Sequence, residues 1–211
     1  MSLTRRRRWT LIASLLVACA AYVACASRAP TSAVWVRLDT ELGAIDLEVD
    51  PVHAPLSATN FLRYVDAGRY DGARFHRTVT IQPDNQPDKA VKIEVVQAGV
   101  APEKATSDFP PIPLERTRDT GLRHVDGCLS MARDAPDTAT SDFFLCVGAQ
   151  PELDFGGRRN PDGQGFGVFG RVVAGMDVVR AIQRSPAREQ ALTPPITIRR
   201  AVRLPVLPSP R

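Results

Sequence analysis

The chain has 211 residues, which is enough for one domain of ordinary size. Hydrophobic residues make up 44% and charged residues 24%, close to the globular average, and this excludes wholesale disorder. The formal net charge of +4 comes entirely from a run of four arginines, Arg5 to Arg8. Because the rest of the chain is formally neutral, a general role in nucleic-acid binding has no electrostatic basis.

The same arginines precede an apolar run of 14 residues, from Leu11 to Ala24. A membrane-spanning helix needs about 20 apolar residues. A positively charged start followed by a shorter apolar run is instead typical of a signal peptide. We therefore expect residues 1–26 to direct export to the periplasmic side of the membrane, and residues 27–33, which are small and polar, to form a short tether.

Three alternatives remain for the processing of this segment. Leu16-Val17-Ala18-Cys19 resembles the lipobox of bacterial lipoproteins, which makes Cys19 the candidate for lipidation and for anchoring to the membrane. Ala24-Cys25-Ala26 offers a site for ordinary cleavage and soluble release. The third alternative is an uncleaved anchor. At the other end, residues 203–211 contain three prolines and are expected to form a frayed tail.

Between these ends, the hydrophobic pattern predicts mostly strands. VWVRLD and IDLEV alternate with period two, and a tight turn at Gly43 separates them. The segment APLSATNFLRYVDAG changes to a helical period, with Ser57 as a candidate cap and Gly68 at its end. The expected strands are 34–39, 45–49, 69–79 after an initial turn, 92–100, 128–131, 141–147, 166–173 and 196–202; the expected helices are 54–68 and 176–184.

About eight strands with short connections and no strand–helix–strand alternation indicate a mainly β, antiparallel fold. We predict a closed eight-stranded barrel capped by two α-helices over residues 34–202, since closure removes exposed strand edges. Residues 80–91 and 101–120 are expected to be long loops. The glycine-rich segment 156–165 is interpreted as turns, because it lacks the Lys-Ser/Thr pair of a phosphate-binding loop.

Cys128 and Cys146 both lie in apolar runs, which favours two buried free thiols, with a disulfide as the alternative in an oxidising compartment. The three histidines, His53, His76 and His124, lack the spacing of metal ligands, and no CxxC motif is present. We therefore expect no metal and no cofactor.

Three segments, taken together and in order, resemble cyclophilin-type peptidyl-prolyl isomerases. They are NFLRYVDAGRYDGARFHR, the strand Val96-Gln97-Ala98-Gly99, and HVDGCLSMARDAPDTATSDFFLC; PELDF and GFGVFGRVVAGMDVV follow in the family's order. The resemblance covers about residues 34–202 and implies the cyclophilin barrel. It also implies catalysis of X-Pro isomerisation, which needs no nucleophile, metal or cofactor. We expect a monomer that binds proline-containing polypeptides and no nucleic acid.

The resemblance assigns roles to individual residues. Arg77 matches the catalytic arginine that bonds the substrate carbonyl and the region of the prolyl nitrogen, and His76 beside it is expected to support it. Substrate-binding matches are Gln97 for the peptide backbone, Phe144 for the floor of the proline pocket, and Val95, Leu153 and Phe166 for its apolar walls.

Four positions depart from the family pattern. Glu94 stands where an ungapped alignment places a pocket phenylalanine, and Glu152 replaces a tryptophan. Arg133 and Asp142 replace an amide pair, and we expect them to form an ion pair with each other; the alternative is that Asp142 pairs with Arg77. Intact Arg77, Gln97 and Phe144 favour an active foldase for exported proteins. The losses at positions 94 and 152 favour a catalytically weak module that binds proline-containing segments.

Overall fold

The computed structural model describes residues 33–205, apart from the side chains of residues 106 and 107. Its strands are β1 (Val34–Thr40), β2 (Gly43–Val49), β3 (Ala73–Val79), β4 (Val95–Gly99), β5 (Cys128–Met131), β6 (Phe143–Cys146), β7 (Gly167–Ala174), β8 (Ala187–Arg188) and β9 (Ala191–Leu204). Its helices are α2 (Pro55–Asp66), α3 (Thr117–Thr120) and α4 (Met176–Gln183), with 3₁₀ turns η1 (Pro102–Ser107) and η2 (Pro151–Leu153).

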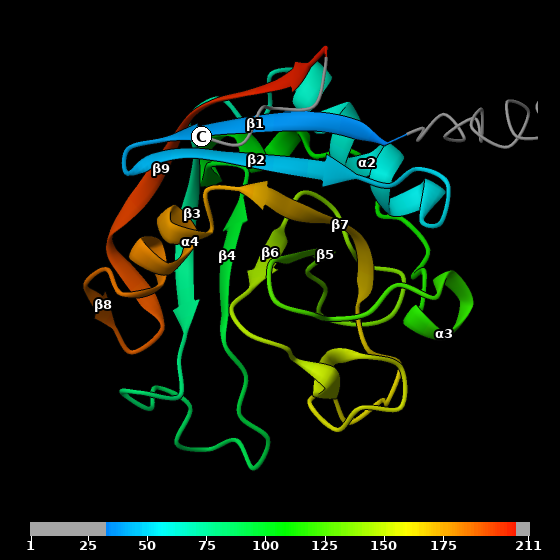
Figure 1. Ribbon diagram of the computed structural model, residues 1–211, viewed down its shortest axis with the longest axis vertical. Coiled ribbons are helices and arrows are strands. Elements are labelled where there is room, and N and C mark those ends of the chain that lie inside the picture. The colour runs from blue at the N-terminus through cyan, green and yellow to red at the C-terminus, as the bar shows by residue number, and fades with distance from the viewer. Residues whose placement is uncertain (1–32, 206–211) are drawn as a thin grey trace, which may run out of the picture. The chain divides into compact units, whose positions relative to one another are not determined.

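Eight of these strands close into an antiparallel barrel (Figure 1). The order is β1-β2-β7-β5-β6-β4-β3-β9, and β9 returns to pair with β1. The short β8 forms a hairpin with β9 outside this ring. The predicted eight-stranded barrel is therefore confirmed, and β8 is an element that the hydrophobic pattern did not reveal because it is only two residues long.

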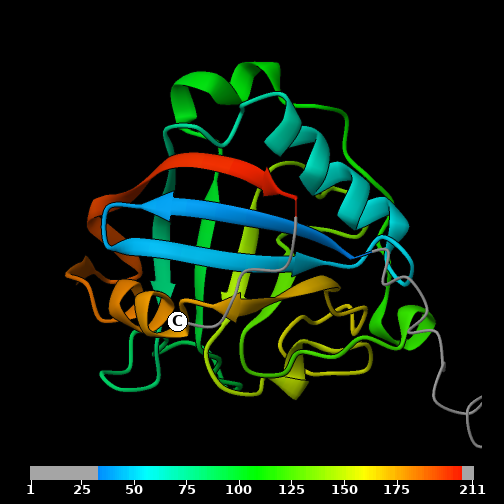
Figure 2. The ribbon, with the colours of Figure 1, turned by 45° about the horizontal axis from the view of Figure 1, so that its top comes forward.

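Alternation along the strands fills the barrel. Val36, Leu38, Ile45 and Leu47 are fully buried, while the residues between them lie nearer the surface on most of the two strands. Such alternation matches the period of two of a strand with one buried face. Helix α2 packs on β7 and β9, and α4 packs on β2, β3 and β4, on opposite sides of the barrel (Figure 2).

Helix α2 begins two residues before the expected cap. Its first residue is Pro55, and the predicted capping role of Ser57 is wrong, because Ser57 lies inside the helix and is buried. Instead, the carboxylate of Glu115, from the 101–120 loop, accepts the backbone N–H groups of Leu56 at 2.9 Å and of Ser57 at 2.7 Å. A carboxylate at this end satisfies unpaired donors and complements the helix dipole.

Strand β9 runs from Ala191 to Leu204, longer than the 196–202 segment expected, and enters the first two residues of the tail expected at 203–211.

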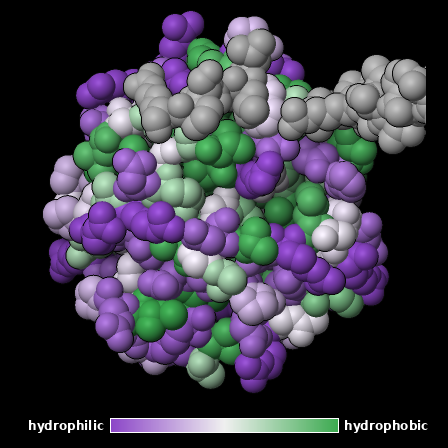
Figure 3. All heavy atoms as spheres, in the orientation of Figure 1, coloured by the Kyte–Doolittle hydropathy of each residue, from purple (hydrophilic) through white to green (hydrophobic). Residues whose placement is uncertain are grey.

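The face of the molecule in Figure 3 is mostly hydrophilic, with hydrophobic residues in small separate groups. Within residues 33–205, no helix is long and apolar enough to cross a membrane. The expected signal segment 1–26, including Cys19, and the tether except residue 33 lie outside the described residues.

Candidate active site

One pocket of about 380 Å³ lies on the outer face of strands β3, β4 and β6 and the loops beside them. Its volume is within the range of small-ligand sites. It brings together eight of the nine residues predicted for the site in the described chain: Arg77, Val95, Gln97, Arg133, Asp142, Phe144, Leu153 and Phe166. His76 lies beside the pocket rather than in its wall.

The strand register explains how Arg77 reaches this pocket. Arg77 lies opposite Gln97, and Gln97 lies opposite Phe144, so the three side chains form a row across β3, β4 and β6. Phe75, two positions earlier in β3, belongs to the barrel core and is fully buried, and in a regular strand Arg77 would lie on the same face. A β-bulge between Phe75 and Arg77 adds one residue, His76, which turns Arg77 to the outer face.

The apolar part of the pocket is built on this row. Phe144 is 4% exposed, and Phe166 packs edge-on against it, with ring centroids 5.3 Å apart and planes at 88°. Val95 and Leu153 complete the buried wall. These residues form the apolar part of the pocket wall.

The buried His124 packs against this apolar surface. Its ring stacks on Phe144 with centroids 5.9 Å apart. Its Nδ1 lies 2.8 Å from Asp154 Oδ1, and its Nε2 lies 3.1 Å from Ser130 Oγ. Burial lowers the pKa of His124, although Asp154 acts in the opposite direction. We assign His124 to positioning of the pocket floor, a role that the sequence pattern did not single out.

Arg77 is held by two amide oxygens and by no carboxylate within the described residues. Its Nε and one terminal nitrogen donate to Gln190 Oε1 at 2.9 and 2.6 Å, and its other terminal nitrogen donates to Gln97 Oε1 at 3.0 Å. Burial lowers the pKa of Arg77, but a guanidinium stays protonated in proteins. Three of its five N–H donors are used within residues 33–205, so two remain available.

Asp142 fixes which way the Gln97 amide faces. Gln97 Nε2 donates to Asp142 Oδ2 at 2.9 Å. An ionised carboxylate can only accept hydrogen bonds, so the amide nitrogen must face Asp142 and the amide oxygen must face Arg77. His76 Nε2 lies 3.6 Å from the same carboxylate oxygen; the supporting role of His76 stays a prediction.

The predicted ion pair between Asp142 and Arg133 is wrong. Arg133 donates instead to Asp162 at 2.8 and 3.0 Å and to the carbonyl oxygen of Gly165 at 2.9 and 2.7 Å. The carboxylate that pairs with Arg133 is therefore that of Asp162, which belongs to the glycine-rich loop. Asp142 lies over the backbone of Gly99, where an added Cβ would come within 1.8 Å of Oδ1. Within residues 33–205, Asp142 does not pair with Arg77 either, since the partners of Arg77 are Gln97 and Gln190.

The two other departures do not line the pocket. The Glu94 carboxylate accepts a hydrogen bond from Gln183 at 3.4 Å, and Glu152 pairs with Arg158 at 2.7 Å. Ile93, which is 6% exposed, lines the pocket instead of Glu94. The alternation of this segment explains the difference, since Ile93, Val95 and Gln97 share one face.

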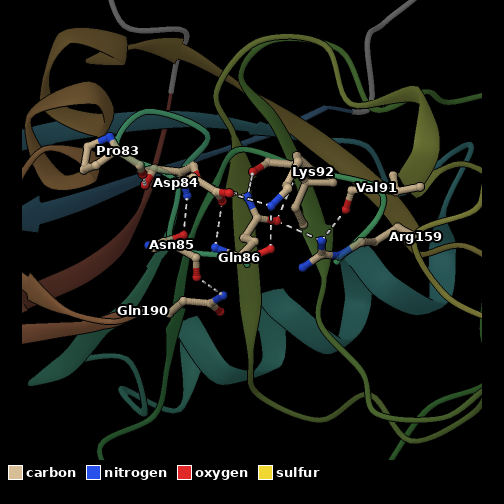
Figure 4. A network of polar contacts seen from close by, with 10 residues as sticks. Pro83, Asp84, Asn85, Gln86, Val91, Lys92, Arg159 and Gln190 are labelled. Atoms are coloured by element: carbon tan, nitrogen blue, oxygen red, sulfur yellow. Dashed lines mark hydrogen bonds and ion pairs between the residues drawn. The ribbon is translucent and has the colours of Figure 1, made fainter. Parts of the chain in front are cut away.

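The loop at 80–91 was expected from the sequence, but the sequence did not indicate that Gln190 and residues 80–92 (the 80–92 loop) help to hold the site together. Gln190 follows β8 and is fixed by two bonds: its backbone oxygen accepts from Thr78 N at 2.8 Å, and its Nε2 donates to Asn85 O at 2.9 Å. Asn85 Nδ2 donates in turn to the carbonyl oxygens of Thr78 and Glu189 at 3.0 and 3.1 Å. Figure 4 shows this network of loop residues around Gln190. No sequence motif links Gln190 to Arg77, which lies 113 positions earlier.

Cys128 and Cys146 belong to the apolar cluster that contains Phe144 and Leu153. Cys128 and Cys146 are both buried free thiols, as favoured from the sequence. Burial raises the pKa of the Cys146 thiol, and a contact with Cys128 adds to this effect. Residues 33–205 contain no group of three or more His, Cys, Asp or Glu side chains arranged to hold a metal ion.

Known proteins are similar to this chain in sequence and in fold. Residues 35–203 match the family model described as cyclophilin type peptidyl-prolyl cis-trans isomerase. Peptidyl-prolyl cis-trans isomerase A of Dickeya dadantii is 37% identical over 157 residues, covering 74% of each chain. Peptidyl-prolyl cis-trans isomerase B of Escherichia coli is 33% identical over 152 residues, covering 70% of this chain and 83% of that one.

Solved structures agree with the barrel. A cyclophilin type peptidyl-prolyl cis-trans isomerase of Cryptosporidium parvum superposes with a TM-score of 0.64 at 20% identity, covering 83% of this chain and 99% of that one. A structure of that protein in the presence of the dipeptide Ala-Pro gives a TM-score of 0.62. At this identity the structures support the fold, while the family model and the closer bacterial relatives support the assignment. This chain belongs to the cyclophilin type peptidyl-prolyl cis-trans isomerase family.

Proposed function

We propose that this cyclophilin-family enzyme accelerates X-Pro isomerisation in exported polypeptides, with Arg77 as the catalytic donor and without a covalent intermediate. The observation that carries the proposal is the row of Arg77, Gln97 and Phe144, which places a guanidinium beside an apolar pocket. The fully buried Leu153 and the half-buried Phe166 complete the wall in which the proline ring would sit.

The chemistry is differential binding of a twisted amide. Rotation about a peptide bond faces a barrier of about 18–20 kcal/mol, because conjugation gives the C–N bond partial double-bond character. In the twisted state the prolyl nitrogen has lost this conjugation and becomes a better hydrogen-bond acceptor. The two remaining donors of Arg77 stabilise that state more than the planar one, and each 1.36 kcal/mol of such preference increases the rate about tenfold.

Preorganisation is the contribution of the surrounding amides. Gln97 and Gln190 hold the guanidinium in place before the peptide binds, so little reorientation is needed during rotation. Because neither amide carries a charge, Arg77 keeps its full electrostatic effect on the peptide. A carboxylate partner would have neutralised part of that effect.

The activity is tested by exchange spectroscopy with the full-length chain and a short peptide that contains one Ala-Pro bond. Uncatalysed isomerisation takes tens to hundreds of seconds, so catalysis produces cis–trans exchange peaks that are absent without the protein. Binding of the peptide without exchange would contradict the proposal and would support the weak binding module instead.

Export and anchoring are a separate part of the proposal, supported by the charged start, the apolar run and the lipobox-like sequence at Cys19. We expect Cys19→Ser to abolish metabolic labelling with a lipid precursor and to move the protein from the membrane fraction to the soluble periplasm. Label that persists in Cys19→Ser would contradict the assignment of Cys19. Wild-type protein without label would favour ordinary cleavage, and unlabelled protein that remains in the membrane would favour an uncleaved anchor.

A further inference from the structure

A second arginine lines the same pocket as Arg77. Arg159 comes from the glycine-rich loop between η2 and β7. One of its terminal nitrogens donates to Gln86 Oε1 at 2.8 Å and to the carbonyl oxygen of Val91 at 2.6 Å (Figure 4). Gln86 is only 1% exposed and is itself bonded to the carbonyl oxygens of Thr80 and Ile93. The guanidinium of Arg159 is therefore held from one side by a buried part of the 80–92 loop.

The other edge of this guanidinium has no acceptor among residues 33–205. Both donors used in the loop belong to one terminal nitrogen, so Nε and the second terminal nitrogen keep their hydrogens unpaired. Elsewhere in the chain this same edge binds carboxylates: Nε and the second terminal nitrogen of Arg37 donate to the two oxygens of Asp46 at 2.7 and 2.9 Å. The unpaired edge of Arg159 has the geometry of a carboxylate fork.

The charges around Arg159 also favour an anion. Arg77, Arg159 and Lys89 all line the pocket, and none of them forms an ion pair with a carboxylate within residues 33–205. Burial lowers the pKa of Arg159, and repulsion from Arg77 adds to this effect. The acidic residues of the pocket, Asp134 and Asp142, come from the segment between β5 and β6, and Asp142 is bonded to Gln97. A carboxylate of a bound peptide near Arg159 would offset the repulsion between Arg159 and Arg77.

We propose that Arg159 is a specificity-determining residue, which selects proline-containing segments that carry a carboxylate side chain within two residues of the proline. This inference rests on the proposed isomerase function, because it assumes that the peptide lies in the pocket of Arg77. Arg159 fits the task better than Lys89, since a guanidinium held by the buried Gln86 offers two parallel donors at a fixed position. The preference for peptides with a carboxylate side chain thus depends on the contact between the 80–92 loop and the glycine-rich segment 156–165.

The test compares peptides that differ by one isosteric pair. Glutamate or glutamine is placed at each of the two positions before and the two positions after a single proline, and kcat/KM is measured by exchange spectroscopy. At one position or more, we expect the full-length chain to turn over the glutamate peptide at least fivefold faster than its glutamine partner. The ratio should fall as salt is raised, because screening weakens the attraction between charges.

Three variants assign the effect. Arg159→Gln should bring the ratio of glutamate to glutamine peptides within twofold of one, and Arg159→Lys, which keeps the charge but loses the fork, should give an intermediate ratio. Arg158→Gln is the matched control, because Arg158 lies one residue earlier, is exposed and pairs with Glu152 outside the pocket; it should keep the wild-type ratio. Each ratio compares two peptides on the same protein. A variant that lowers kcat/KM equally for both peptides, for example by loosening the loop, therefore leaves the ratio unchanged.

The same peptides separate the two proposals. If the wild-type ratio is within twofold of one at all four positions while isomerisation proceeds, the role of Arg159 is overturned and the isomerase function stands. A preference that survives in Arg159→Gln would overturn it as well. If no peptide is isomerised, the proposed function fails, and dissociation constants for the same pairs then decide the role of Arg159: equal affinities for the glutamate and glutamine peptides reject it.

Discussion

The two sides of Arg77 are built differently. On one side, Gln97 and Asp142 belong to or adjoin strands of the barrel, and the strand register fixes their positions. On the other side, Gln190 stands in the β8–β9 connection and is held by Asn85 of the 80–92 loop. Both sides offer an amide oxygen to the same guanidinium. Gln97 lies within strand β4, whereas Gln190 lies between β8 and β9, where its backbone oxygen accepts from Thr78 N and its side chain donates to Asn85 O. The position of Arg77, the proposed catalytic donor, therefore depends on the loop side as well as on the strands.

Of the two sides, we expect the loop side to give the larger fall in kcat when its hydrogen bonds to Arg77 are removed. Gln190→Ala removes two of the three hydrogen bonds that hold Arg77. Because hydrogen bonds to charged groups contribute about 1.5–3 kcal/mol each, the guanidinium should become mobile and kcat should fall about five- to tenfold. KM should change less than about twofold, since the apolar pocket is intact.

Gln183→Ala is the matched control for this prediction, because Gln183 is a partly buried glutamine on α4 that bonds to Glu94 away from the pocket. Its kcat should stay within about twofold of wild type. An unchanged kcat in a folded Gln190→Ala protein would mean that the strand side alone positions Arg77.

A smaller effect is expected on the strand side. Asp142→Asn keeps an acceptor for Gln97 but also adds donors, so the Gln97 amide is no longer held in one orientation. We expect kcat/KM to fall about two- to threefold, less than 0.7 kcal/mol by the usual conversion of rates. A loss larger than that of Gln190→Ala would reverse the comparison between the two sides.

The same variant should have the opposite effect on stability. Burial raises the pKa of Asp142, although the bond from Gln97 and the charge of His76 oppose the shift. The folded protein therefore holds the proton of Asp142 more tightly than the unfolded chain, and stability is lost as the pH rises through the raised pKa. We expect urea unfolding to show that Asp142→Asn is more stable than wild type at pH 7 and that the gain shrinks toward pH 4. A gain that grows on acidification would show that the sign of the shift is wrong.

The sequence predicted the strand side well and the loop side poorly. Alternation and the order of family segments predicted the barrel, and they placed Arg77, Gln97 and Phe144 in one site. The partner of Asp142 was predicted wrongly, because nearness in sequence favoured Arg133, whereas the glycine-rich loop supplies Asp162 to that arginine. Gln190 and Arg159 could not be predicted, since long loops without periodicity place their side chains through tertiary contacts alone.

The central claim is that Arg77 carries the catalysis in this pocket, and its direct test is the kcat/KM of Arg77→Ala on an Ala-Pro peptide. Arg158→Ala, an exposed arginine outside the pocket, is the control, and circular dichroism establishes that both variants are folded. We predict a loss of at least tenfold for Arg77→Ala, equivalent to about 1.4 kcal/mol of transition-state stabilisation, and wild-type turnover for Arg158→Ala. Wild-type turnover by a folded Arg77→Ala protein would contradict the account.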